Sequence, residues 1–155
     1  MNIYILRHGE AELVADTDSQ RALTAKGREE TLQMARWLAP QLQGLDLVLV
    51  SPYLRAQQSW EVMATCLPAP GAVQPEPELV PHGHARQVAD YLQVLATQGV
   101  ENVLLVSHLP LVGYVASELC PGLVPPLFVT SGLAELVLQQ GQGRLIRMTS
   151  PHDIV

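Results

Sequence analysis

The stretch at residues 3–12, IYILRHGEAE, joins an apolar run to an arginine, a histidine and a glycine, and then turns acidic. Continuous apolar runs this short are typical of strands buried on both faces of a parallel sheet. Two similar runs follow along the chain, LDLVLV at 45–50 and VLLV at 103–106. The three runs predict a mainly parallel sheet, and the polar residues that end the first run suggest that an anion binds there.

Amphipathic helical patterns lie between these runs, as expected for an α/β protein whose sheet is covered on both sides. Thr24 suits the N-cap of one helix, which Pro40 ends or kinks. Ser51 suits the N-cap of a second helix, with Pro52 at its first position. Two further helices are predicted, at residues 85–98 before a glycine stop and from about residue 110.

The end of the chain predicts a hairpin, because the segments LAELVLQQ and RLIRMTS are joined by Gly-Gln-Gly at 141–143. The Pro- and Gly-rich stretches 68–83 and 121–126 are predicted to be loops. Neither stretch has a flank long enough to form a core of its own, so we expect one domain over residues 1–155. The prediction is a single-domain, three-layer α/β fold.

The composition excludes several classes of protein. With 48% hydrophobic and 15% charged residues, the chain is not of the disordered class. A formal net charge of −6 excludes a general nucleic-acid binder. No apolar run approaches the ~20 residues that span a bilayer, and the chain opens directly into a strand rather than a signal peptide. The expected location is the cytoplasm.

Four candidate site residues follow predicted strands. Arg7 and His8 end the first strand, Arg55 lies in the first turn of the helix after the second, and His108 follows the third. Open α/β sheets bind ligands beyond the carboxyl ends of their strands. These side chains are therefore expected to converge, and the helix starts at Pro52 and Pro110 would point their amides at the same crevice. This arrangement predicts an anion site, with phosphate as the favoured anion.

Four motifs, LRHGEAE, RALTAKGREE, SPYLRAQQS and VSHLPLVGYVASELCPG, resemble those of the histidine phosphatase superfamily. Their close spacing in a short chain resembles the SixA-type phosphohistidine phosphatase branch. The resemblance implies a phosphoglycerate mutase-like fold with no metal and no organic cofactor. It implies that His8 is the nucleophile that takes the phosphoryl group and that Arg7, Arg55 and His108 bind its oxygens. Arg21 matches a further phosphate-side arginine of this branch.

The chemistry requires a neutral His8, since only the free ring nitrogen attacks phosphorus. A second cation is disfavoured beside Arg7 and Arg55, so these arginines are expected to keep the ring neutral near pH 7. A protonated His108 would add a charge-assisted donor to the phosphoryl group. Gly9 would allow a close approach of backbone to phosphate, or would simply form a turn.

The superfamily resemblance also implies a carboxylic acid that protonates the leaving oxygen, but no carboxylate is assigned to this role. Glu10, Glu12 and Glu78 are candidates by their position, but a solvated loop glutamate is the favoured explanation of Glu78, and Glu10 and Glu12 are also explained as surface charges. A phosphohistidine departs as neutral imidazole and needs little acid assistance, whereas an alkoxide needs a proton donor. The uncertain acid therefore favours a phosphohistidine substrate.

The expected function is removal of phosphate from a protein phosphohistidine in signal transduction, such as that of a histidine phosphotransfer (HPt-type) domain in a phosphorelay. About 30 residues separate Arg55 from the helix at residue 85, which is too few for a large lid over the site. The apolar segment at 124–129 could contact such a protein partner or belong to the core. Two alternatives stay open: hydrolysis of small phosphomonoesters, and a non-catalytic phosphate-binding scaffold. A metal site is not predicted, because the histidines lack ligand spacing.

Overall fold

The computed structural model describes residues 1–154, so only Val155 of the predicted domain lies outside the described residues. Its centre is one six-stranded sheet with the order β3-β2-β4-β1-β5-β6. The first four strands in this order are parallel, and β5 and β6 run antiparallel at one edge. The strands are β1 (Asn2–Arg7), β2 (Leu47–Val50), β3 (Ala72–Pro75), β4 (Asn102–Ser107), β5 (Leu133–Gln139) and β6 (Gln142–Thr149). The predicted mainly parallel α/β fold is confirmed.

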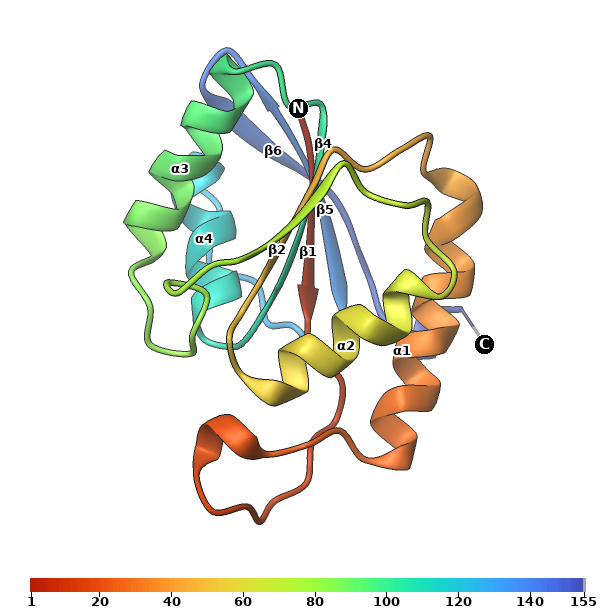
Figure 1. Ribbon diagram of the computed structural model, residues 1–155. Coiled ribbons are helices and arrows are strands. Elements are labelled where there is room, and N and C mark those ends of the chain that lie inside the picture. The colour runs from red at the N-terminus through yellow and green to blue at the C-terminus, as the bar shows by residue number, and fades with distance from the viewer. Residues whose placement is uncertain (155) are drawn as a thin grey trace.

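Helices cover both faces of the sheet and complete the three layers (Figure 1). The four α-helices are α1 (Ala25–Leu38), α2 (Leu54–Ala64), α3 (Ala85–Thr97) and α4 (Leu111–Leu119), and the short 3-10 helices are η1 (Asp18–Gln20), η2 (Ala39–Gln41) and η3 (Pro151–Asp153). One hydrophobic core joins α3 and α4 to the sheet, and the other joins α1 and α2 to its opposite face. Among the described residues, no helix is both long and apolar enough to cross a membrane.

The apolar runs in the sequence are continuous because their strands pack on both faces. In β1, Ile3 and Ile5 belong to the core beneath α3 and α4, whereas Leu6 belongs to the core beneath α1 and α2. The central strand β4 divides in the same way, with Leu105 on one side and Val106 on the other. Alternate side chains of a strand point to opposite faces, so both helical layers are anchored to the same strands.

Three details of the sequence prediction are wrong. The predicted loop at 68–83 contains β3, a short edge strand parallel to β2, which its proline and glycine content concealed. The second helix begins at Leu54, and the residue in the N-cap position is Tyr53 rather than Ser51. The hairpin turns at Gln140 and Gly141, both with positive φ, so β6 already begins at Gln142.

The start of α1 is held against the segment that follows β1. As predicted, Thr24 is the N-cap, and its Oγ1 accepts a hydrogen bond from the Gly27 amide at 2.9 Å. A Cβ atom on Gly9 would lie 2.6 Å from Thr31 Oγ1 and 2.7 Å from the Gly27 carbonyl oxygen. Gly9 is therefore required for close packing against α1, a reason that neither sequence interpretation of this glycine included.

Candidate active site

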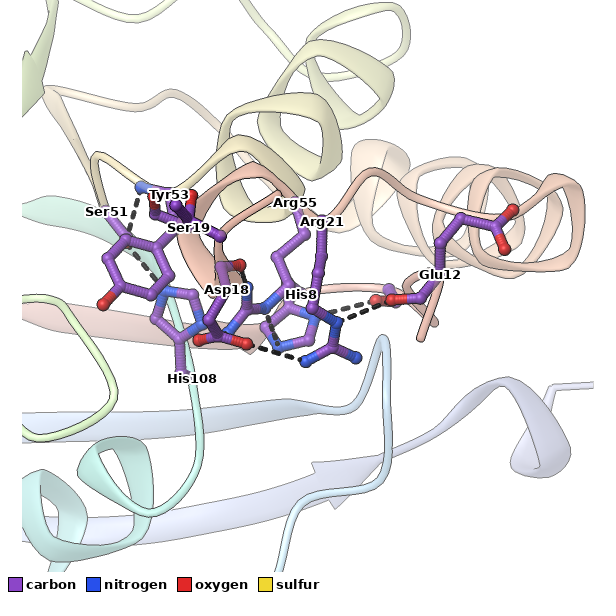
Figure 2. Close-up of polar contacts among 11 residues, drawn as sticks. His8, Glu12, Asp18, Ser19, Arg21, Ser51, Tyr53, Arg55 and His108 are labelled. Atoms are coloured by element: carbon purple, nitrogen blue, oxygen red, sulfur yellow. Dashed lines mark hydrogen bonds and ion pairs between the residues drawn. The ribbon is translucent and has the colours of Figure 1, made fainter. Parts of the chain in front are cut away.

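The predicted site residues meet at the carboxyl ends of adjacent strands. Arg7 and Ser107 are register partners at the ends of β1 and β4, and the His8 amide donates to the Ser107 carbonyl at 3.0 Å. The rings of His8 and His108 lie with their centroids 5.0 Å apart. Arg55, the second residue of α2, reaches His8 from the strand β2 side (Figure 2). The strand-end argument thus places these four residues correctly.

The His8 ring is fixed with one nitrogen free for reaction. Its Nδ1 lies 2.7 Å from the carbonyl oxygen of Gly9, which can only accept a hydrogen bond, so Nδ1 carries the proton. Nε2 consequently has the lone pair, and it accepts a hydrogen bond from Arg55 Nε at 3.3 Å. This tautomer presents Nε2 as the nucleophilic atom, and the side chain is only 7% exposed.

Burial is the main reason that His8 is neutral. Desolvation, followed by the nearby charges of Arg55, Arg7 and Arg21, lowers the pKa of His8 to about 4, although its hydrogen bond to Gly9 acts in the opposite direction. The expected neutral ring is confirmed, but burial lowers the pKa of His8 more than the charges of the arginines do. Near pH 7 almost every molecule has its Nε2 lone pair available.

His108 is held by Ser51, the serine that fails to cap α2. Ser51 Oγ lies 2.7 Å from His108 Nε2 and accepts a hydrogen bond from the Tyr53 amide at 3.2 Å. His108 Nδ1 is buried and has no partner among the described residues, and it carries the ring proton in the tautomer in which Ser51 donates to Nε2. Burial and the neighbouring His8 lower the pKa of His108 to about 2, so the ring is neutral rather than protonated as considered from the sequence.

Ser51→Ala is expected to lower activity by about tenfold and the free energy of unfolding by roughly 1–3 kcal/mol, because it leaves the buried His108 Nε2 without a partner. Steady-state kinetics and urea unfolding measure the two effects. Ser19→Ala is the matched control, since the hydroxyl of this half-buried serine has one hydrogen bond within residues 1–154, to Thr17 Oγ1 at 3.1 Å. An unchanged Ser51→Ala protein would show that His108 does not depend on this hydrogen bond.

The three arginines differ in how their donors are used. Arg7 donates from Nη1 to the Phe128 carbonyl oxygen at 2.9 Å, and its Nε is buried with no partner in residues 1–154. Arg55, only 4% exposed, donates from Nη1 to the Asp18 carbonyl oxygen at 2.6 Å and from Nη2 to its carboxylate at 3.1 Å. Arg21 donates from Nε to the Glu12 carbonyl oxygen and from Nη1 to Asp18. Arg55 and Arg21 thus bind the same residue, Asp18, whereas Arg7 binds the Phe128 carbonyl.

Asp18 is the site residue that the sequence did not reveal. It opens the short helix η1, in a polar loop with no periodicity or motif, and its carboxylate bridges Arg55 and Arg21 (Figure 2). Hydrogen bonds from these two arginines lower the pKa of Asp18. Asp18 is identified only by its ion pairs with Arg55 and Arg21, the two candidate phosphate-binding arginines. These ion pairs form only when the loop is folded.

The carboxylates considered from the sequence are engaged elsewhere. Glu78 accepts hydrogen bonds from the amide and the Nδ1 of His84. Glu10 accepts from Thr24 Oγ1 and pairs with Lys26. The Glu12 carboxylate points away from His8 (Figure 2).

The anion-binding role of the helix N-termini stays a prediction, and two amides near them already have acceptors within the chain. The Tyr53 amide donates to Ser51 Oγ at 3.2 Å, and the Val112 amide donates to the His108 carbonyl oxygen at 2.9 Å. Within residues 1–154, no three His, Cys, Asp or Glu side chains form a group that could hold a metal ion.

The two buried histidines predict acid sensitivity of the fold. An unfolded histidine gains a proton below about pH 6.5, whereas His8 and His108 stay neutral in the folded chain until about 4 and about 2. The unfolded state therefore binds more protons as the pH falls, and stability should drop by roughly 1–2 kcal/mol per ring between pH 7 and 5. Urea unfolding at both pH values measures this drop.

A double variant, His8→Gln with His108→Gln, is expected to lose most of this pH dependence. His82→Gln is the matched control, because His82 is exposed and should leave the dependence unchanged. The same drop in the double variant as in wild type would show that other groups cause the acid sensitivity.

Known proteins are similar to this chain in sequence and in fold. The model of the histidine phosphatase superfamily (branch 1) matches residues 3–81. The chain is 47% identical to the phosphohistidine phosphatase SixA of Escherichia coli K12, over 99% of this chain and 96% of that protein. It is 39% identical to the SixA homolog of Haemophilus influenzae, over 94% and 93%. A solved structure of the protein histidine phosphatase SixA complexed with tungstate superimposes with a TM-score of 0.97 at 46% identity, covering 100% of both chains.

Proposed function

The chain belongs to the histidine phosphatase superfamily and to its SixA-type branch, and we propose that it hydrolyses phosphohistidine on a protein. One observation carries this proposal. The two buried side-chain nitrogens without a partner in residues 1–154, Arg7 Nε and His108 Nδ1, both belong to the cluster around His8. Buried donors are almost always paired, so a pair of unpaired donors beside a nucleophilic nitrogen supports an oxyanion site. The similar SixA structure holds tungstate, an oxyanion of this type.

The geometry supports a two-step reaction. The His8 Nε2 lone pair attacks phosphorus, a nitrogen–phosphorus bond forms at Nε2, and the bond to the substrate ring nitrogen breaks. The hydrogen bond from Nδ1 to the Gly9 carbonyl stabilises the positive charge that develops on the ring. Water then attacks the phosphorus of phospho-His8, which releases inorganic phosphate and restores the free ring.

The surrounding donors stabilise charge on the transferred group. Arg7, Arg55, Arg21 and the neutral His108 N–H are proposed to bind the phosphoryl oxygens as the group passes between the two nitrogens. Arg55 lies closest to the nucleophile, since its Nε is 3.3 Å from Nε2. One set of side chains thus serves both binding and catalysis.

Two features support a protein phosphohistidine over a small phosphate ester. The carboxylates of Glu10, Glu12 and Glu78 are engaged or turned away, which suits a leaving group that needs little protonation. Exposed apolar side chains lie in the segments adjoining the site: Leu13 is 88% exposed in the loop after His8, and Leu127 is 87% exposed beside the carbonyl that binds Arg7. Such side chains suit contact with another protein.

The substrate within this class is proposed to be an HPt-type domain of a phosphorelay, which would place the chain in cytoplasmic signal transduction. The test compares phosphate release, in EDTA, from a phosphorylated phosphotransfer domain and from p-nitrophenyl phosphate. Faster release from the protein substrate is expected. A clear preference for the ester would overturn the substrate assignment and leave the roles of the site residues intact.

A further inference from the structure

The Asp18 carboxylate occupies donors that a phosphoryl group would need. Its Oδ2 lies 3.1 Å from Arg55 Nη2 and its Oδ1 lies 3.0 Å from Arg21 Nη1, while its carbonyl oxygen lies 2.6 Å from Arg55 Nη1. With Arg55 Nε directed at His8, every nitrogen of the Arg55 guanidinium has a partner within the chain. The Asp18 carboxylate bridges the two arginines (Figure 2).

A carboxylate and a phosphoryl group compete for such donors because both present a pair of charged oxygens to a guanidinium. The proposed reaction requires Arg55 to bind phosphoryl oxygens. Binding therefore requires that the Asp18 carboxylate give up at least part of its contact with Arg55. The carboxylate also adds a negative charge beside an anion site, which repels an incoming phosphate.

The two partners differ in their freedom to move. Arg55 is 4% exposed and its guanidinium lies over the Tyr53 ring, 5.1 Å from the centroid. The Asp18 side chain is 57% exposed, and η1, the short helix that it opens, contains no buried residue. Displacing Asp18 disturbs little packing, whereas displacing Arg55 would disturb the buried site. The carboxylate is the partner that can yield.

We propose that Asp18 is an internal competitor for the phosphoryl group, which keeps Arg55 and Arg21 in place in the free enzyme and weakens the binding of inorganic phosphate. Asp18 then favours release of the product, and it limits inhibition by free phosphate. The inference rests on the proposed function only in taking Arg55 and Arg21 as phosphoryl ligands.

The test measures the affinity for inorganic phosphate by calorimetry, and in parallel its inhibition constant against turnover. Asp18→Asn and Asp18→Ala are expected to bind phosphate about tenfold more tightly than wild type, the effect of losing one charge-assisted competitor. Asp16→Asn is the matched control, since it removes the same charge from the same loop and its carboxylate has no hydrogen bond or ion pair with residues 1–154. Its affinity should stay within about twofold of wild type.

Tighter binding cannot come from a damaged fold, because a disordered site would bind phosphate more weakly. Affinity in both Asp18 variants equal to or below that of Asp16→Asn, or no detectable binding in any of them, would overturn the inference. The binding measurement needs no phosphohistidine, so its outcome is separate from that of the proposed function. Tighter binding without phosphohistidine turnover would leave the competitor role standing, and turnover with unchanged affinity would remove that role alone.

Discussion

His8→Ala is expected to reduce phosphohistidine turnover by about 10⁴-fold or more, because it removes the nitrogen that we propose accepts the phosphoryl group. The hydrogen bond from Nδ1 to the Gly9 carbonyl places the ring proton on Nδ1, so the lone pair is on Nε2. The pKa of the ring, about 4, keeps that lone pair unprotonated near pH 7. No other described histidine except His108 is buried at the site, and the Nε2 of His108 is engaged with Ser51. A substitute nucleophile is therefore not expected.

Rapid-quench measurement with a labelled phosphotransfer domain tests this result. Wild type should carry an acid-labile phosphoryl group on His8, and His8→Ala should carry none while still binding inorganic phosphate through Arg7 and Arg55. His82→Ala is the matched control, an exposed loop histidine with no expected effect. Circular dichroism establishes that each variant is folded. Turnover by His8→Ala within tenfold of wild type would contradict the nucleophile role.

The sequence predicted the parts of the fold that depend on local pattern. The runs at 3–6, 45–50 and 103–106 are continuous because their strands bury both faces, and all three lie within or overlap the central strands. Strand β3 was missed because an edge strand with exposed residues needs no apolar run. Its pairing with β2 arises from tertiary contact rather than from the composition of the segment.

The site was predictable to the extent that it depends on strand ends. The ends of strands β1, β2 and β4 predict that Arg7, His8, Arg55 and His108 lie close together. This prediction does not depend on the path of the loops. Asp18 was not predictable, because its contact with Arg55 spans 37 residues and depends on the path of an irregular loop. The cause of the lowered His8 pKa was also only partly predictable, since burial is a property of the folded chain.

Arg55→Ala is expected to lower kcat/KM by about 10³-fold, because it removes the guanidinium that contacts His8 Nε2 and that we propose binds the phosphoryl oxygens. Arg55→Lys keeps the charge but loses the planar fork, and a loss of about 10²-fold is expected. Steady-state kinetics on the phosphohistidine substrate measure both. Arg86→Ala is the matched control, since Arg86 is exposed on α3 and its one ion pair within residues 1–154 is with Asp90.

The structure indicates a second cause for the lower kcat/KM of Arg55→Ala, which is repulsion by Asp18. A double variant separates this cause from the loss of the Arg55 donors. Without Arg55, the Asp18 carboxylate keeps only Arg21 as an ion-pair partner and still repels the phosphoryl group. The double variant Arg55→Ala with Asp18→Asn is therefore expected to recover about tenfold of the lost kcat/KM relative to Arg55→Ala alone. Additive losses in the double variant would show that Asp18 supports catalysis independently of Arg55. Wild-type kinetics in Arg55→Lys would show that the charge alone is sufficient and that the fork geometry of Arg55 is not used.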